Sequence, residues 1–454
     1  AGQGHEVTVI ERDRQVGGLC KTVRRDGYCF DLGGHRFISA NPALVALVES
    51  LLGPDLLIGE RRSVIRLEGK DYRYPIEAGD VLRQAGLRAS VRYVASFARQ
   101  RLFARPRDEE EASFEGWVVR RFGRALYTTF FGQYTEKLWG LSPRELSADW
   151  APQRISLVNL WDVARRAVGL GQGTPRTYAR RYYYPRRGFG QIAERLAEAA
   201  VRLGARIELG TRVAGLAADG RRLAAATVER DDGGRAELTF DVLVSTIPLP
   251  DLGRLLPQPD PAVREAASQL AFRSLRFLNL MLDRPDVSPN TWIYVPEKRY
   301  LMTRIQEPRR RTPEAAPPGK TSLMLEIPCR AGDEIWQAPD DRLAARVLDD
   351  LKALGLDVAG DVRGYFSTFA EHAYPVYTLD YQRHRRTLIA AVGRYENAAT
   401  CGRQGLFRYC FSDAAMEMGF AAARWAAGRG RRREIEGRAA DKRLIETTSI
   451  VAGG

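Results

Sequence analysis

The chain has little of what a metal enzyme or a disulfide-stabilised protein needs. It contains only 4 histidines and 5 cysteines, and the cysteines stand apart without a Cys-x-x-Cys pair. Such sparse thiols predict neither a disulfide framework nor a structural zinc site, and they are typical of a reducing, cytoplasmic location. No run of about 18 uncharged apolar residues occurs, so the sequence predicts no transmembrane segment.

What the chain does have is length and positive charge. Its 454 residues are enough for two or three domains, and 44% apolar residues are typical of a globular protein. The formal net charge of +14 fits a solvated basic surface. Attraction to anionic substrates or to an acidic membrane surface is the alternative. No nucleic-acid-binding motif accompanies the charge, so nucleic acid is not an expected partner.

The amino-terminal stretch "HEVTVIERDRQVGG" carries part of a nucleotide-binding signature. A short β-branched strand over residues 7–10 runs directly into Glu11, and Gly17 and Gly18 follow. An acid at the end of such a strand binds an adenosine ribose in dinucleotide-binding folds, whereas a solvated strand end is the plainer interpretation. The glycine-rich turn that accompanies this acid lies about 20 residues upstream of it. We therefore expect the first βα unit of the fold to be missing from the sequence.

Hydrophobic periodicity outlines the rest of the chain. Residues 80–180 are largely helical by pattern, and an amphipathic helix is predicted over residues 188–204. A meander of strands follows and ends in a buried strand over residues 241–246. A further buried strand is predicted over residues 388–392. Nucleotide-type strands at separate places predict one sheet assembled from distant segments.

Breakers and charges mark three other features. The stretch "EPRRRTPEAAPPGK", residues 307–320, predicts an exposed and mobile loop. Asp413 is a predicted N-cap for the helix that follows it. The charged tail after Gly428 lacks periodicity, and we expect it to fray.

Two short motifs offer candidate binding groups. "DLGGHRF", residues 31–37, combines two glycines with a histidine and an arginine, which suits a tight turn as well as a site. In "GRQGLFRY", Arg403, Arg408 and Tyr409 stand before a helix start, where an anion or a diphosphate binds well. An ordinary loop with exposed arginines is the alternative. No catalytic triad order and no P-loop is found, which favours a cofactor that brings its own reactivity.

Several segments together resemble one group of flavoproteins. "GHEVTVIERDRQVGGLCKTV" is similar to FAD-binding proteins of the amine oxidase and protoporphyrinogen oxidase superfamily. "FEGWVVRRFGRALYTTFFGQYTEKLWGLSPREL" is closer to UDP-galactopyranose mutase, whose segment carries a "YTxKxWGxxPxEL" pattern. "YRYPI", "YYYPRRGFGQI", "AYPVYTLD" and "GRQGLFRY" follow in the same order as mutase-like segments. The resemblance spans roughly Gly4 to Trp425.

This resemblance implies an α/β fold with a Rossmann-like, two-dinucleotide-binding-domain FAD-binding domain. A helical domain and a sheet-based substrate domain would be inserted into it. The implied boundaries are 1–75, 185–250 and 385–428 for the discontinuous FAD-binding domain, 76–184 for the helical domain, 251–384 for the substrate-binding domain and 429–454 for the charged tail.

The resemblance also implies the site residues. The cofactor FAD would be bound by Glu11, Arg12, Gly17, Gly18, Gly33, Gly34, His35, Val213, Gly402, Arg403 and Asp413. The substrate would face Tyr134, Trp139, Arg154 and Tyr409, which otherwise are ordinary core or surface residues. Glu11 would hold the adenosine ribose, Val213 would lie beside the adenine and Arg403 would approach the flavin. The flavin would carry the chemistry, and no metal is expected.

The main hypothesis is an FAD-dependent oxidoreductase or flavin-dependent mutase that acts on a nucleotide sugar or a similar diphosphate-bearing small molecule. An FAD oxidase or desaturase of the protoporphyrinogen oxidase or amine oxidase type is the alternative. A non-catalytic basic protein that binds polyanions in a salt-sensitive way is the third hypothesis. The chain departs from the mutase pattern at two places near the flavin. Ile38 replaces a second histidine, and Phe411 replaces the first aspartate of "RYxDMD". A homo-oligomer is compatible with the resemblance.

Overall fold

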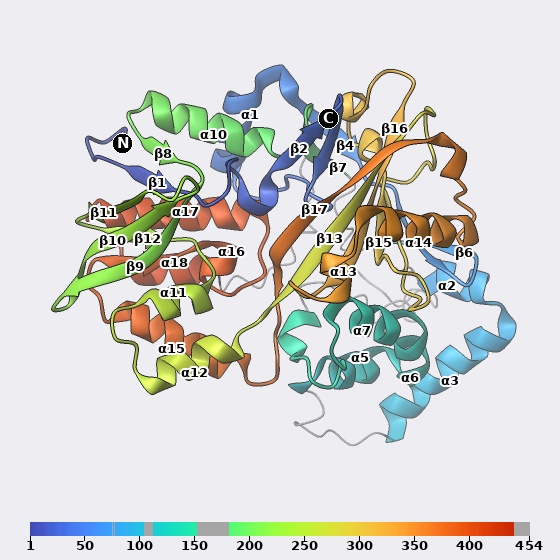
Figure 1. The fold of residues 1–454 in the computed structure, drawn as a ribbon. Coiled ribbons are helices and arrows are strands. Elements are labelled where there is room, and N and C mark those ends of the chain that lie inside the picture. The colour runs from blue at the N-terminus through green and yellow to red at the C-terminus, as the bar shows by residue number, and fades with distance from the viewer. Residues whose placement is uncertain (75, 77, 104–111, 152–180, 440–454) are drawn as a thin grey trace.

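The computed structural model describes residues 1–74, 76, 78–103, 112–151 and 181–439. Within them the fold is mixed α/β, with one large sheet and several smaller ones (Figure 1). The long strands β13 and β17 run through the middle of the molecule in Figure 1, between a helix-rich half and the remainder of the large sheet. Among the described helices, none has both the length and the apolar character required to cross a membrane.

The large sheet has seven strands, in the order β17-β13-β16-β15-β14-β5-β6. Neighbouring strands are antiparallel except β14 and β5, which are parallel. Strand β16 is buried along its whole length, which explains its apolar run "SLMLEIP". The strands are β5 (Ser63–Leu67), β6 (Lys70–Arg73), β13 (Phe272–Leu282), β14 (Trp292–Tyr294), β15 (Arg304–Gln306), β16 (Thr321–Cys329) and β17 (Val362–Pro375).

Two short parallel pairs correspond to the predicted nucleotide-type strands. β1 (Thr8–Ile10) pairs with β8 (Arg206–Glu208), and β12 (Leu243–Ser245) pairs with β18 (Ala398–Thr400). Strands therefore form where they were predicted, over residues 7–10 and 241–246, but the predicted burial and the single sheet are wrong. Val9 is 43% exposed and Val244 is 37% exposed, and the two pairs are separate two-stranded sheets. The remaining strands are β2 (Thr22–Arg25), β3 (Tyr28–Asp31), β4 (Leu56–Glu60), β7 (Arg181–Pro185), β9 (Thr211–Asp219), β10 (Arg222–Arg230) and β11 (Arg235–Thr239).

Helices cover the sheets and form a group of their own beside β14. That group consists of α2 (Ala78–Ala85), α3 (Leu87–Phe103), α5 (Phe114–Phe122), α6 (Arg124–Leu126), a π-helical stretch (Tyr127–Gly132) and α7 (Gln133–Trp139). The others are α1 (Pro42–Leu52), α10 (Gln191–Arg202), α11 (Leu249–Leu255), α12 (Pro261–Gln269), α13 (Glu334–Gln337), α14 (Asp340–Ala353), α15 (Tyr381–Gly393), α16 (Gly402–Gly405), α17 (Ser412–Ala426) and α18 (Arg432–Ala439).

The predicted strand over residues 388–392 is wrong, because these residues lie in helix α15. Leu388, Ala391 and Val392 are buried at helical spacing, three and four residues apart. A short apolar run fits a buried strand and a buried helix equally well. The strand of this region is β18, which lies farther along the chain.

The loop at residues 307–320 is only in part the exposed segment that its prolines and arginines predict: Pro313, Glu314, Pro318 and Gly319 are exposed, but other residues are not. Glu307 and Thr312 are buried, because they bond to distant segments. Glu307 accepts hydrogen bonds from the amide of Ser288 at 2.9 Å and from the hydroxyl of Thr321 at 2.8 Å. The segment also forms two short 3-10 helices, Pro308–Arg310 and Pro313–Ala315, and its prolines and glycine do not determine exposure.

The expected fraying after Gly428 is contradicted as far as residue 439. Helix α18 forms there, and its Ile435 is fully buried. The guanidinium of Arg432 donates hydrogen bonds of 2.9 Å to the carbonyl oxygens of Tyr395 and Ala398, which holds the helix against strand β18.

Candidate active site

A buried carboxylate fixes the loop that carries the paired glycines. Asp31 ends strand β3 and is 2% exposed. It accepts hydrogen bonds from the hydroxyl of Thr22 at 2.7 Å and from the hydroxyl of Tyr184 at 2.6 Å. The amide of Phe189 donates a third, at 3.0 Å. Four chain segments therefore meet at Asp31, and the loop that follows it starts from a fixed point.

Next to this loop lies an ion pair inside the large sheet. The register of β15 and β16 places Arg304 opposite Glu326, and the guanidinium lies 2.5 Å from the carboxylate. Gln306 donates a hydrogen bond to Glu326 and accepts one from Arg311. The Nε atoms of Arg304 and Arg311 are buried and have no hydrogen-bond partner within the described residues. The network therefore holds two arginines in place and leaves each with an unused donor.

The glycine loop passes directly against this arginine. A Cβ atom on Gly34 would lie 2.9 Å from a terminal nitrogen of Arg304, so a larger residue here would displace the guanidinium. His35 stacks on Phe189 with ring centroids 5.1 Å apart, and its buried Nδ1 has no partner among the described residues. Burial lowers the pKa of His35 to about 4, against the opposing charge of Asp31. The imidazole is therefore neutral at neutral pH, with one nitrogen available to a ligand.

A cluster of aromatic side chains surrounds Tyr374 and contacts the guanidinium of Arg403. The Tyr374 ring lies 5.8 Å from Trp139, 5.9 Å from Tyr409 and 5.1 Å from the Arg403 guanidinium. Arg403 also lies over Tyr409 at 4.3 Å, and Trp150 contacts both Trp139 and Tyr409. Trp139 Nε1 and Arg403 Nε are buried without a partner among the described residues. The predicted residues Trp139, Arg403 and Tyr409 are thus brought together.

Tyr134 approaches the same region from helix α7. Its ring lies 6.1 Å from Tyr294, and the Arg304 guanidinium lies 5.7 Å from Tyr294. Tyr374 is also close enough to Arg304 to interact with it electrostatically. The Arg304 network and the aromatic cluster are therefore neighbours. Arg154, the fourth predicted substrate residue, lies outside the described residues.

The other predicted cofactor residues surround the end of strand β1. Glu11 Oε1 accepts a hydrogen bond of 2.8 Å from the amide of Asp13, and no described residue bonds its second oxygen. Gly17 has a φ of +108°, and a Cβ there would lie 3.2 Å from that of Ala193. Gly18 also has a positive φ, of +52°. Glycine is therefore required by conformation at this turn.

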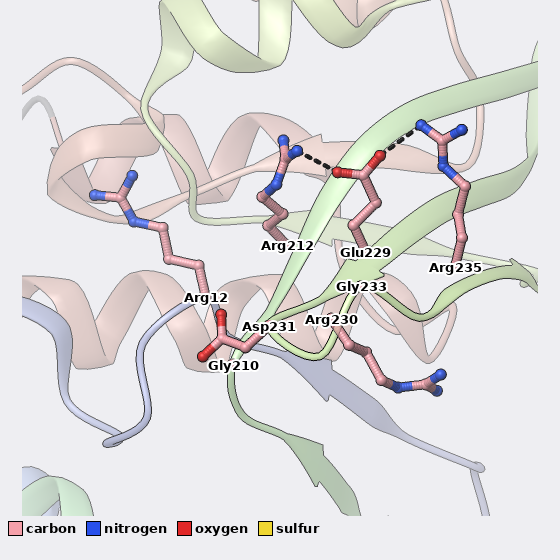
Figure 2. A pocket seen from close by; sticks show the side chains of 8 residues that line it. All are labelled: Arg12, Gly210, Arg212, Glu229, Arg230, Asp231, Gly233 and Arg235. Atoms are coloured by element: carbon pink, nitrogen blue, oxygen red, sulfur yellow. Dashed lines mark hydrogen bonds and ion pairs between the residues drawn. The ribbon is translucent and has the colours of Figure 1, made fainter.

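A basic surface pocket of about 460 Å³ opens beside this strand end (Figure 2). It is lined by Arg12, Gly210, Arg212, Glu229, Arg230, Asp231, Gly233 and Arg235. Glu229 pairs with both Arg212 and Arg235, as the dashed lines in Figure 2 show. Arg12 is bonded to Glu371 at 2.8 Å. Val213, the predicted adenine neighbour, follows Arg212 along strand β9 and is not among the residues that line the pocket.

Asp413 is not the N-cap that its position predicted. Helix α17 begins at Ser412 with Phe411 at the cap position, so Asp413 lies in the first turn. Its carboxyl is buried, and Oδ1 has no partner within the described part of the chain. Burial raises the pKa of Asp413 to about 6, and Glu417 adds to the shift. Gly402, with a φ of +82°, opens the preceding helix α16.

Changing Asp413 to asparagine is expected to remove part of the pH dependence of stability. The folded pKa of about 6 lies above the ordinary 3.8. Protonation of Asp413 therefore contributes to the free energy of unfolding in full below about pH 4, and this contribution is lost as pH rises through about 6. Two pKa units correspond to roughly 3 kcal/mol, so the variant should be more stable than the wild type above about pH 7, by about 2 kcal/mol.

Urea unfolding between about pH 4 and about pH 8 measures this difference. The lowered pKa of His35 makes the free energy of unfolding rise with pH in the same range, which is opposite to the effect of Asp413. This contribution is the same in the variant and in the wild type, so it cancels when the two are compared. If the free energy of unfolding depends on pH equally in the variant and in the wild type, the pKa of Asp413 is not raised in the folded protein.

Sequence reasoning missed Arg304, Arg311, Glu326 and Tyr374. Arg304 and Glu326 stand within the apolar stretches "LMTRIQ" and "SLMLEIP", where a charged residue on a buried strand signals a partner. Arg311 lies in the loop at residues 307–320, which its composition predicts to be exposed, so a buried role for it was not expected. Tyr374 lies in the mutase-like segment "AYPVYTLD", but no local pattern separates it from a core aromatic.

Comparison with solved structures shows that this fold is shared with UDP-galactopyranose mutase and a putative protoporphyrinogen oxidase. Reduced UDP-galactopyranose mutase superposes with a TM-score of 0.81 at 18% identity, covering 98% of this chain and 100% of that one. A putative protoporphyrinogen oxidase from Exiguobacterium sp. 255-15 gives a TM-score of 0.66 at 18% identity, covering 88% and 90%. At this level of sequence identity, both comparisons show that the fold is shared and do not show a shared activity.

The family is shown by sequence. The chain belongs to the flavin containing amine oxidoreductase family, whose model matches residues 1–407. It is therefore a flavin-dependent enzyme, and its cofactor is FAD. A coproporphyrinogen III oxidase from Propionibacterium freudenreichii subsp. freudenreichii is 23% identical over 403 residues, covering 79% of this chain and 74% of the relative.

Proposed function

We propose that FAD binds with its adenosine at the end of strand β1 and its flavin near helix α16. The free oxygen of Glu11 would accept from the ribose, and Arg12 and Val213 would adjoin the adenosine. Gly17 and Gly18 would line the middle of the cofactor. The flavin end would be formed by Gly33, Gly34, His35, Gly402, Arg403 and Asp413.

Unpartnered buried atoms support this placement. His35 Nδ1, Arg403 Nε and Asp413 Oδ1 are each buried without a hydrogen bond in the described part of the chain. A buried polar group left without a partner costs about 1–3 kcal/mol. A flavin ring, whose edge offers both donors and acceptors, would satisfy such groups.

The domain boundaries given above follow as part of the same proposal, with one adjustment. Strand β5 pairs with β14 and strand β6 pairs with β5, so residues 63–73 belong with the sheet-based substrate domain. A reducing, cytoplasmic location is proposed from the cysteines, since all five are free thiols.

The substrate that this site favours is a nucleotide sugar or a similar diphosphate-bearing molecule. Arg304 and Arg311 each keep an unused, buried donor that the flavin placement does not use, and this is the observation that carries the proposal. A diphosphate offers acceptors that match guanidinium geometry, and such bonds are strong where water is excluded. Tyr134, Trp139 and Tyr409 would supply aromatic faces for the rest of the substrate.

The arginines would also act on the reaction. Charge develops on a diphosphate oxygen when the bond to the sugar breaks, and a fixed guanidinium stabilises that charge. The neutral His35 would donate or accept a hydrogen bond without adding charge. The flavin, when bound, supplies the reactive centre, as expected of a mutase that produces no net redox change.

A second candidate is an FAD oxidase or desaturase of the protoporphyrinogen oxidase type. It is favoured by the match to the coproporphyrinogen III oxidase, which extends over 403 residues. In that case Trp139, Trp150 and Tyr374 would form the wall for an apolar substrate that loses a hydride.

Two assays on the FAD-loaded protein distinguish these functions. Under anaerobic conditions with chemically reduced flavin, the mutase hypothesis predicts that a UDP-hexopyranose is converted to its furanose isomer, detected by chromatography. No conversion is expected with oxidised flavin. Substrate-dependent formation of hydrogen peroxide in air, without isomerisation, would instead establish the oxidase and contradict the mutase.

A further inference from the structure

Helix α3 carries an apolar stripe on its outward face. Leu87, Val91, Val94, Ala98 and Leu102 follow one another at spacings of four, three, four and four residues. Each residue turns the helix by about 100° around its axis, so these five side chains lie within an arc of about 80° on one side of it. The four larger side chains are 82%, 60%, 57% and 74% exposed, in that order. We call these five residues the α3 stripe.

The α3 stripe lies on a different face of the helix from the side chain that packs against the protein core. Tyr93 points the opposite way and is buried in a cluster with Val81 and Phe130. Helix α3 therefore has an apolar face that supports the fold and a second one that the described residues leave uncovered. Figure 1 shows α3 at the outer edge of the molecule, beside α2. Single exposed leucines are ordinary, but a continuous stripe marks an interaction surface.

Arginines border the stripe, and the helix contains no acidic residue. Arg88, Arg92 and Arg99 lie within about 40° of arc along one border, and Arg101 lies along the other. In the described part of the chain no carboxylate pairs with any of these four. A hollow of about 640 Å³ beside the first border is lined in part by Arg92, Arg99 and Arg124, the last of which is paired with Glu115. Among the described residues, the borders of the stripe are therefore positively charged.

These charges argue against a second copy of this chain as the partner. A two-fold contact through the stripe would bring the same four arginines of each copy together with no acid on either helix. An acidic lipid surface supplies the opposite charge along both borders. Long arginine side chains reach headgroup phosphates while their stems lie along the apolar stripe.

We propose that α3 is an interfacial helix, by which the enzyme docks on membranes that contain acidic phospholipids. The stripe would enter the boundary between headgroups and acyl chains, with the helix lying in the membrane plane. The arginines at its borders would bind headgroup phosphates, and the hollow beside Arg92 and Arg99 would hold one of them. This inference does not depend on which substrate the active site takes.

Vesicle flotation with the full chain tests the proposal. We expect binding to vesicles of phosphatidylcholine mixed with phosphatidylglycerol, and little binding to phosphatidylcholine alone. Binding should weaken between about 0.1 M and about 0.5 M salt. The double variant V91D/V94D should bind the mixed vesicles roughly tenfold or more weakly than the wild type. Its thermal unfolding midpoint should be unchanged, because both side chains are exposed.

A matched control introduces the same charges elsewhere. Val201 and Leu203 are 53% and 61% exposed on helix α10 and its end, so V201D/L203D should bind vesicles like the wild type. The proposal fails if the wild type does not bind mixed vesicles, or if V91D/V94D binds them equally well. It also fails if ultracentrifugation shows a wild-type dimer that V91D/V94D abolishes, since the stripe would then join two copies.

Discussion

Replacing Asp31 by alanine is expected to lower the free energy of unfolding by about 3–5 kcal/mol. The carboxylate accepts hydrogen bonds from Thr22, Tyr184 and the amide of Phe189, and all three donors would be left buried. Each unsatisfied donor costs about 1–3 kcal/mol. Arg311, 3.9 Å from the carboxylate, would lose a nearby counter-charge as well.

Urea unfolding measures this loss, with Asp219→Ala as the matched control. Asp219 is exposed at the end of strand β9, and its removal should change the free energy of unfolding by less than about 0.5 kcal/mol. A loss of under about 1 kcal/mol for Asp31→Ala would show that the four segments do not depend on this side chain.

Replacing Arg304 by lysine is expected to weaken binding of UDP by about 30- to 1000-fold. Lysine keeps the positive charge beside Glu326, so the fold should survive, but it lacks the second planar donor that a diphosphate would use. Loss of charge-assisted hydrogen bonds of this kind corresponds to about 2–4 kcal/mol. The measurement is calorimetric titration of the FAD-loaded protein with UDP.

Arg330→Lys is the control for this substitution, because Arg330 is exposed just beyond the end of strand β16. Its affinity for UDP should equal that of the wild type. If Arg304→Lys binds UDP as tightly as Arg330→Lys, then Arg304 serves the sheet alone, and the diphosphate must be sought elsewhere.

Local sequence patterns predicted much of the fold, and they failed where burial depends on distant partners. The β-branched run before Glu11 and the run that ends at Ser245 are strands, as their composition predicts, although most of their side chains are not buried. The run at residues 388–392 has the same composition but is helical, and its pattern alone does not separate the two states. In the loop at residues 307–320, Glu307 and Thr312 are buried and form hydrogen bonds with Ser288 and Arg186, which are distant in sequence.

The same limit applies to the site. By resemblance, Trp139 and Tyr409 were expected near the substrate and Arg403 near the flavin, and the structure places all three around Tyr374. Arg304 and Glu326 were missed, because only the register of two strands places them opposite each other. Strand register is a property of the assembled sheet, so no short segment of sequence contains it.

The central claim is that buried arginines of an FAD enzyme bind a diphosphate. Calorimetric titration of the FAD-loaded wild-type protein with UDP, and in parallel with uridine, tests it most directly. UDP should bind at least about 100-fold more tightly than uridine, since only UDP reaches the unused arginine donors. Equal binding of the two ligands, or no binding of UDP, would exclude a diphosphate site at these arginines and leave the oxidase as the better hypothesis.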